Sequence, residues 1–359
     1  MTRNRPWRVT VIVTSSSLQG LRPRFIPANE ADMHPKRHLL RTPAMPFITP
    51  FTSCGAARMT RRFSLLAAGA AALALLSGCS VSKVLDTLVP HDTYQGQTGV
   101  AYGSDPRQRL DVYRPAVPAA DGKAPVVLFI YGGSWTRGER ADYRFVGEAL
   151  AANGIIAVVA DYRLSPQVGY ASMLADNALA LQWTLAHAAE LGGDPTRTYL
   201  MGHSAGAYNA AMLALDPRWL RQVDLSPSQL AGWIGLSGPY DFLPIVDPEV
   251  KIAFDWPHTP ADSQPIEHAT RSAPRSLLVA GTGDDIVDAE RNTQGLARKL
   301  RAAGADVQVQ MLKGVGHITT VAALARPLDW LAPVLPRVLD FVRQPPQPEA
   351  RTRLQTKVP

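Results

Sequence analysis

Residues 198–207 read TYLMGHSAGA, and this stretch decides the fold class. The apolar run at 198–202 predicts a strand, and the alanine-rich run at 205–215 predicts a helix. Between them, residues 202–206 (GHSAG) fit the pattern G-x-S-x-G. A sharp strand–turn–helix of this kind places the serine above the end of a sheet and at a helix N-terminus, where developing negative charge is favoured. Ser204 is therefore the candidate nucleophile.

Strands and helices alternate on both sides of this stretch. The predicted strands cover 108–113, 125–131, 155–161, 198–202, 231–236, 276–280 and 306–312, and the predicted helices 139–153, 171–191, 205–215, 289–303 and 328–342. The strands at 125–131 and 155–161 are apolar throughout, which is typical of strands buried on both faces. The strand at 108–113 alternates and is followed by Pro115, so it is expected near an edge. We predict an α/β fold, a mainly parallel sheet with helices on both faces.

The domain organisation follows from where this alternation starts, breaks and stops. Residues 93–343 are predicted to form one α/β domain. Residues 239–274 interrupt the rhythm and are rich in Pro, Asp and His, so we expect a short insertion over the carboxyl edge of the sheet. Residues 344–359 are expected to be a disordered tail.

A serine hydroxyl needs a base to take its proton, and the base needs an orienting carboxylate. The expected chain order is Ser…Asp…His. His317 follows the predicted strand at 306–312, and Asp284, Asp285 and Asp288 follow the strand at 276–280. Open parallel sheets place their sites at these carboxyl ends. His317 and Asp284 are therefore the candidate base and orienting residue, with Asp285 left as the main alternative. His203 is expected to point away from Ser204.

A site for acyl transfer also needs donors for the oxyanion. Residues 131–135 read YGGSW and follow the predicted strand at 125–131. Paired glycines let backbone N–H groups approach a substrate oxygen closely. We assign the oxyanion hole to the N–H of Gly133 or Ser134, together with that of Ala205.

Six stretches together resemble the α/β-hydrolase fold, in its esterase/lipase branch with an HGG-type oxyanion motif. They are YGGSW at 131–135, DYRLSP at 161–166, GHSAGA at 202–207, SGPYDF at 237–242, GTGDD at 281–285 and GVGH at 314–317. The chain looks most like bacterial carboxylesterases related to feruloyl esterases, kynurenine formamidase and isoprenylcysteine methylesterase. Tyr131 stands where HGG relatives have His, so the hydrogen bonding beneath the loop must differ. We interpret Asp161, Tyr162, Arg163 and Asp176 as bracing groups, and Tyr240 and Asp241 as candidates for lining the pocket.

The segment at 60–79 reads TRRFSLLAAGAAALALLSGC. Its apolar run is too short for a membrane span of about 20 residues but fits a signal-peptide core of roughly 7–15. The run ends in LSGC at 76–79, which resembles a bacterial lipobox. We predict a lipoprotein signal peptide at 59–78, lipid on Cys79 and a tether at 79–92.

Residues 1–58 precede the natural start of that signal at Met59, so they are either a start assigned too early or a disordered extension. The formal net charge of +7 belongs to the leader. Residues 1–78 hold eleven Lys and Arg against two acids, leaving 26 basic and 28 acidic residues beyond them. The rest of the chain thus gives no electrostatic reason to expect nucleic acid.

The predicted function is a serine carboxylesterase that hydrolyses small to medium esters through an acyl-enzyme. An amidase or formamidase with the same triad is the first alternative, although a formamidase of a cytosolic metabolite fits an exported protein badly. A non-catalytic surface lipoprotein is the second, and it would predict a broken triad. We expect no cofactor and no metal, because no His/Cys/carboxylate cluster has metal-ligand spacing. The expected location is the cell envelope, in the outer membrane of a Gram-negative cell.

Overall fold

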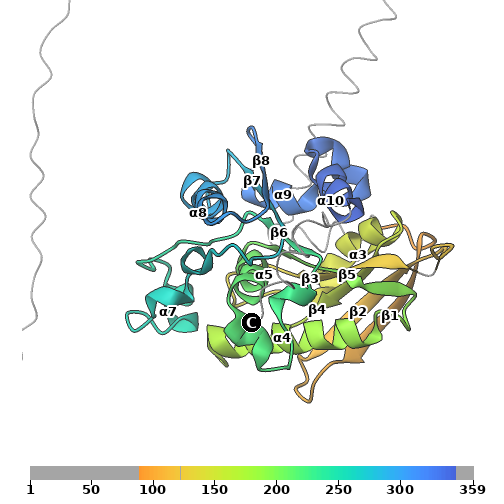
Figure 1. Ribbon diagram of the computed structural model, residues 1–359, viewed down its shortest axis with the longest axis horizontal. Helices are drawn as coiled ribbons and strands as arrows, with labels where there is room; N and C mark the ends of the chain where they lie inside the picture. The colour runs from red at the N-terminus through yellow and green to blue at the C-terminus, as the bar shows by residue number, and fades with distance from the viewer. Residues whose placement is uncertain (1–88, 122, 345–359) are drawn as a thin grey trace, which may run out of the picture. The chain divides into compact units, whose positions relative to one another are not determined.

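The computed structural model describes residues 89–121 and 123–344, which fold around an eight-stranded sheet (Figure 1). The strands are β1 (Tyr94–Ala101), β2 (Arg109–Pro115), β3 (Ala124–Ile130), β4 (Ile156–Ala160), β5 (Gly193–His203), β6 (Gly232–Leu236), β7 (Ser276–Gly281) and β8 (Val307–Leu312). Their order across the sheet is β1-β2-β4-β3-β5-β6-β7-β8. Strand β2 is antiparallel to both neighbours, and the other pairs are parallel. The mainly parallel sheet is confirmed.

Helices cover both faces of this sheet. They are η1 (Arg140–Tyr143), α3 (Arg144–Ala151), α4 (Tyr170–His187), α5 (Ala205–Leu215), α6 (Pro217–Arg221), η2 (Pro227–Gln229), α7 (Pro248–Ala253), η3 (Ala261–Ser263), η4 (Pro265–His268), η5 (Glu290–Gln294), α8 (Gly295–Ala303), α9 (His317–Ala322), η6 (Arg326–Leu331) and α10 (Val334–Arg343). In Figure 1, α3 and α10 lie on one side of the strands and α4 lies on the other. As predicted, every residue of β3 (APVVLFI) and β4 (IAVVA) is buried.

Strand β1 and helix α9 are among the elements that were not predicted. Strand β1 reads YQGQTGVA and is mostly exposed, because it lies at the edge of the sheet and needs few apolar side chains. Since β1 occupies the edge, β2 is the second strand and not the outermost. Helix α9 has only six residues, HITTVA, which is too short to show a helical period.

The predicted insertion at 239–274 folds into the short helices α7, η3 and η4. Tyr208, on the first turn of α5, donates its hydroxyl to the carbonyl of Ser263 at 2.8 Å. Ile266 donates its N–H to the carbonyl of Tyr240 at 3.1 Å. Because α5 starts where β5 ends, the insertion lies at the carboxyl end of the sheet.

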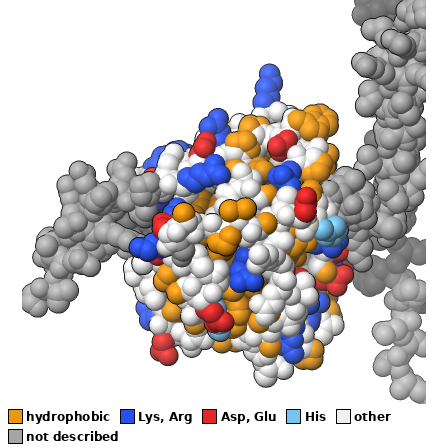
Figure 2. Space-filling view, turned by 90° about the vertical axis from the view of Figure 1, so that its right-hand side faces the viewer, with side chains coloured by type: hydrophobic (Ala, Val, Ile, Leu, Met, Phe, Trp, Pro, Cys, Tyr) orange, Lys and Arg blue, Asp and Glu red, His pale blue; other side chains and the backbone are white. Residues whose placement is uncertain are grey.

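Several predicted segments lie outside the described residues: 1–58, the signal at 59–78, Cys79 and the tail beyond 344. At the end of the predicted tether, Val89 is buried against the core. Among the described residues, no helix is long and apolar enough to cross a membrane. On the face shown in Figure 2, basic and acidic side chains are interspersed, so this face offers no broad field of one sign.

Candidate active site

Ser204 occupies a strained turn between β5 and α5. Its backbone angles are φ 54° and ψ −123°, a conformation that a non-glycine residue rarely adopts. A Cβ on Gly202 would lie 2.2 Å from the carbonyl oxygen of Gly206. A Cβ on Gly206 would lie 2.0 Å from the carbonyl oxygen of Ile130. Both glycines of G-x-S-x-G are thus required by close backbone approach, as expected for a turn that displays a nucleophile.

His317 and Asp284 form a buried pair. The Nδ1 of His317 lies 2.9 Å from Oδ2 and 3.1 Å from Oδ1 of Asp284. The side chain of Asp284 is fully shielded, and its Oδ1 also accepts the N–H groups of Ile286 and Val287. Burial alone would raise the pKa of Asp284, but the bonds from His317, Val287 and Ile286 hold it below its usual value. Asp284 is therefore an ionised acceptor, which places the proton of His317 on Nδ1 and leaves Nε2 free.

Of the three candidate carboxylates, the structure pairs Asp284 with the histidine and leaves Asp285 and Asp288 exposed. Asp288 instead caps the next segment, where its Oδ1 accepts the N–H groups of Glu290 and Arg291. Among the described residues, the hydrogen bonds of His317 Nδ1 go to Asp284 and not to Asp285 or Asp288.

Backbone contacts hold the two loops that carry this pair. Gly283 donates its N–H to the carbonyl of Val315 at 3.0 Å, and Thr282 donates to Leu312 at 2.9 Å. The Oγ1 of Thr282 in turn accepts the N–H of Gly314 at 2.9 Å. The loops after β7 and β8 are therefore joined before any catalytic side chain is considered.

His203 links the nucleophile turn to His317. Its ring lies 4.9 Å from the ring of His317, and its Nε2 lies 3.1 Å from the carbonyl oxygen of His317. Burial, and then the nearby imidazole of His317, lower the pKa of His203 to about 3. The ring is therefore neutral at pH 7, and its Nε2–H donates to that carbonyl.

The contact between nucleophile and base is open. Among the described residues, no hydrogen bond joins Ser204 Oγ to His317, although His203, next to Ser204, contacts His317 directly. In unliganded sites such bonds are often long and tighten only when substrate binds.

The predicted oxyanion loop lies against Ser204. A Cβ on Gly132 would lie 2.9 Å from both Ser204 Cβ and the carbonyl oxygen of His203. Gly133 has φ 126°, and Ser134 has φ 52°. Among the described residues, the N–H groups of Gly133, Ser134 and Ala205 donate to no backbone acceptor. All three predicted donors are thus unengaged, and the loop and the start of α5 meet at Ser204.

Tyr131 anchors this loop from below. Its hydroxyl donates to Asp161 Oδ1 at 3.0 Å and accepts from Arg107 Nη2 at 2.7 Å. Burial raises the pKa of Tyr131 well above its usual value, so the hydroxyl stays protonated. Asp161 also accepts the backbone N–H of Arg140 at 2.6 Å and its Nη1 at 2.5 Å. Asp161 therefore braces the loop. The hydrogen bonds of the Tyr131 hydroxyl take the place of those that a histidine would make at this position.

The network extends to the antiparallel edge of the sheet, which the sequence did not indicate. Arg140 Nε donates to Asp111 on β2 at 2.8 Å, and Asp111 accepts the N–H of Gly99 on β1. Asp176 makes a second centre, since it pairs with Arg163 at 2.7 Å and accepts from Gln108. The one available signal was Asp111, a carboxylate inside a strand of otherwise apolar inward positions.

One prediction about the pocket is wrong. Tyr240 is fully buried, so its side chain does not line an open pocket. Asp241 is partly exposed and pairs with Arg291 at 3.0 Å. The Oδ1 of Asn292 accepts the N–H groups of both residues and fixes this corner of the insertion.

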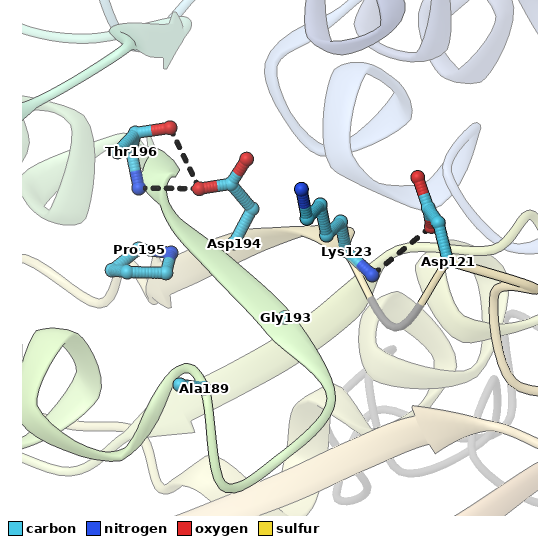
Figure 3. A pocket seen from close by; sticks show the side chains of 7 residues that line it. All are labelled: Asp121, Lys123, Ala189, Gly193, Asp194, Pro195 and Thr196. Carbon is cyan, nitrogen blue, oxygen red and sulfur yellow. Dashed lines mark hydrogen bonds between the residues drawn. The ribbon is translucent and has the colours of Figure 1, made fainter.

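A hollow at the other end of the sheet does not belong to this site. Figure 3 shows Lys123, Asp194 and Thr196 around it, with Asp194 bonded to Thr196 of its own turn. It lies at the start of β5, whereas Ser204 follows the end of that strand. Among the described residues, no three His, Cys, Asp or Glu side chains are grouped so as to hold a metal ion.

Comparisons with known proteins place this geometry in context. The BD-FAE family model matches residues 110–300, just over half of the 359-residue chain. A probable isoprenylcysteine alpha-carbonyl methylesterase from Arabidopsis thaliana is 31% identical over 240 residues, covering 61% of this chain and 50% of the relative. Esterase LipC from Mycobacterium tuberculosis is 30% identical over 249 residues, covering 63% of this chain and 60% of the relative. The chain thus spans about half to three fifths of these relatives.

Solved structures agree on the fold. Inhibited esterase B from Lactobacillus rhamnosis superposes with a TM-score of 0.63 at 19% identity, covering 81% of this chain and 99% of the other. A truncated carbohydrate esterase from gut microbiota gives 0.61 at 19% identity, covering 74% and 99%. At such identities the likeness establishes the shared fold.

Proposed function

This chain belongs to the BD-FAE family of α/β-hydrolases, and from that premise we propose that it is a serine carboxylesterase acting through an acyl-enzyme. One observation carries the proposal. A serine in a strained turn, a buried His317–Asp284 pair and unengaged backbone N–H groups lie at the carboxyl ends of strands β3, β5, β7 and β8 of one sheet. The names of the relatives, which include methylesterases and an esterase, support the same reaction class.

Each residue then has one role. Ser204 Oγ attacks the ester carbonyl while Nε2 of His317 takes its proton, and Asp284 holds the imidazole with Nδ1 protonated. The oxyanion that forms accepts hydrogen bonds from Ala205 and from Gly133 or Ser134. His317 gives the proton to the departing alcohol. A water molecule, deprotonated by the same imidazole, then attacks the acyl-enzyme; the acid is released and His317 returns the proton to Ser204 Oγ.

We propose small to medium esters as substrates, because the insertion at the carboxyl edge is short and its helices have only three to six residues. A series of p-nitrophenyl esters of increasing acyl length tests this, with kcat/KM expected to be highest for short chains. The matching p-nitroanilides test the amidase alternative. A higher kcat/KM on an anilide than on its ester would replace the esterase assignment.

The triad is tested by removal. Ser204→Ala and His317→Ala should each abolish most activity, and the double variant should be hardly worse, because parts that act as a unit are not additive. A fluorophosphonate probe should label wild-type Ser204 and fail to label Ser204→Ala. EDTA should have no effect. Activity that survives Ser204→Ala, or that EDTA abolishes, would overturn the proposal.

We further propose that the protein is an exported lipoprotein held in the cell envelope through Cys79, and in the outer membrane of a Gram-negative cell. The order of basic residues, short apolar run and LSGC at 76–79 supports this. The mature protein should fractionate with membranes, and Cys79→Ala should release it or block processing. A wild-type protein that stays soluble with residues 1–78 attached would contradict the proposal.

A further inference from the structure

The oxyanion loop is strained at three successive positions. Gly133, Ser134 and Trp135 have φ of 126°, 52° and 60°. Positive φ is unfavourable for a residue as large as tryptophan and persists only where the surroundings impose it. Gly133 accommodates its positive φ because it has no side chain, and a Cβ there would lie 2.2 Å from the carbonyl oxygen of Arg137. Something other than the local sequence must hold Trp135 in place.

The side chain of Trp135 supplies that hold. It is almost fully buried, and its Nε1–H donates to Oδ1 of Asn209 at 3.1 Å. The ring meets Tyr208 and Phe254 edge-on at 5.3 and 4.8 Å, and Phe242 lies 5.8 Å away. The carbonyl of Trp135 accepts the N–H of Ser165 at 2.9 Å. The aromatic contacts hold the ring in place. Its hydrogen bond to Asn209 and its contact with Tyr208 connect it to α5.

Asn209 is placed to connect the two halves of the oxyanion hole. It is fully buried on α5, five residues after Ser204, and the N–H of Ala205 begins the same helix. Because an indole N–H can only donate, Oδ1 of Asn209 must face Trp135. Its Nδ2 then has no partner among the described residues. Burying an amide with an unpaired Nδ2 costs free energy, so we expect the hydrogen bond that its Oδ1 accepts to have a function.

We propose that Asn209 is a positioning residue for the oxyanion hole. Its hydrogen bond to Trp135 holds the N–H groups of Gly133 and Ser134 at a fixed distance from that of Ala205. Asn209 touches no reacting atom and acts only through the loop. This inference rests on the proposed esterase function and adds to it a residue that lies outside both sequence motifs.

The test compares two buried asparagines. Asn209→Leu removes the acceptor at nearly constant volume. Asn177→Leu is the matched control, since Asn177 is fully buried on α4 and its Nδ2 donates to the carbonyl of Met173 on its own helix. Removing an oxyanion donor costs about 10²–10³ in rate, so misplacing donors should cost about 10–10²-fold. In Asn209→Leu we expect that loss in kcat on p-nitrophenyl acetate with KM nearly unchanged, and an equal loss in fluorophosphonate labelling rate. Asn177→Leu should keep kcat.

Trp135→Phe tests the same bond from the donor side, because phenylalanine keeps an aromatic ring but has no N–H. It also decides the matter if Asn209→Leu does not fold. The double variant should be no slower than either single variant, since each removes one shared interaction. A kcat in Asn209→Leu or Trp135→Phe equal to that of Asn177→Leu, or a loss confined to KM, would overturn the inference. If Ser204→Ala is inactive in the same experiment, the esterase proposal stands regardless.

Discussion

Three loops carry groups of the proposed catalytic machinery: those after β7 and β8, and the one after β3. The first two are held in place differently from the third. The first two are joined by backbone hydrogen bonds such as Gly283 to Val315. The third depends on side chains from distant parts of the chain, among them Arg107 and Asp161. We call the loops after β7 and β8 the backbone-held region and the loop after β3 the side-chain-held region. Substituting the catalytic carboxylate should leave the first region folded, whereas substituting a bracing side chain of the second should lower the stability of the whole domain.

The largest effect is expected in the backbone-held region. Asp284→Asn should lower kcat by about 10⁴, because an amide cannot keep the imidazole in the tautomer that frees Nε2. Stability should change little in comparison, since the backbone bonds between the loops remain. Kinetics on a p-nitrophenyl ester and thermal unfolding check the two expectations separately.

Asp285→Asn is the control for that substitution, because Asp285 is the exposed neighbour. It should lose less than about threefold in kcat, as expected for a solvated surface residue. If instead Asp285→Asn is the inactive variant and Asp284→Asn is not, the orienting role belongs to Asp285.

The side-chain-held region should respond in stability first. Asp161 is buried and accepts from Tyr131 and twice from Arg140. Asp161→Asn removes one of the two carboxylates that pair with Arg140 and should lower the free energy of unfolding by about 3 kcal/mol, typical of breaking a buried pair. Its kcat should fall less than that of Asp284→Asn. Denaturant unfolding and steady-state kinetics measure both.

Glu249→Gln provides the comparison, because the Arg137–Glu249 pair is also near this loop but is 67% and 54% exposed. An exposed ion pair contributes about 0–1 kcal/mol, so this variant should be close to wild type. An Asp161→Asn protein as stable as Glu249→Gln would show that the buried network does not hold the loop.

The sequence predicted the backbone-held region well and the side-chain-held region poorly. Ser204 follows β5 directly, and Asp284 and His317 lie in the loops just after β7 and β8, so chain order and strand ends bring them to one edge of the sheet. The choice of Asp284 over Asp285 depends on which carboxylate receives the N–H groups of Ile286 and Val287, which chain order does not encode.

The bracing residues could not be found that way. Arg107 and Arg140 lie in a loop and a short helix without a motif, and they meet Asp111 and Asp161 only because β2 and β4 are neighbours in the sheet. A polar, exposed edge strand such as β1 gives no periodic signal for the same reason: its partner supplies the order that its own sequence lacks. Asn209 escapes detection because its importance depends on the indole that it faces.

A third prediction concerns His203, which precedes Ser204 and contacts His317. Its pKa is lowered to about 3, chiefly by burial and next by the imidazole of His317, while the hydrogen bond to the His317 carbonyl and then Asp284 oppose the shift. An unfolded histidine titrates near 6.5, so as pH falls below that value the unfolded state binds a proton that the folded state refuses. Stability should therefore fall between about pH 6.5 and 3, by about 2 kcal/mol at pH 5.

His203→Gln isolates this contribution, since the other titrating groups remain. The difference in unfolding free energy between pH 7.5 and pH 5 should be smaller in the variant than in wild type. An identical pH dependence in the two proteins would mean that the ring of His203 takes up its proton in the folded state.

The smallest effect is expected from Tyr131→Phe, which removes the two hydrogen bonds of the Tyr131 hydroxyl, to Asp161 and from Arg107, and leaves the rest of the bracing network. The ring would stay stacked on Tyr162 and Tyr143 at 5.0 and 5.4 Å. Asp161 would keep Arg140, and Arg107 would keep the carbonyls of Gly138 and Tyr162. The loss should be about 1–2 kcal/mol of unfolding free energy, because each typical hydrogen bond contributes about 0.5–1.5 kcal/mol net.

The matched control is Tyr199→Phe, because Tyr199 is equally buried and donates its hydroxyl to the carbonyl of Val342 on α10 at 3.1 Å. Both variants should lose similar stability, and both should keep kcat within about twofold, since neither changes the hydrogen bond between Trp135 and Asn209. A large fall in kcat in Tyr131→Phe alone would mean that the tyrosine hydroxyl, and not the indole, sets the position of the oxyanion donors. In that case the Tyr131 network would position the oxyanion donors, and the hydrogen bond between Trp135 and Asn209 on α5 would contribute to stability alone.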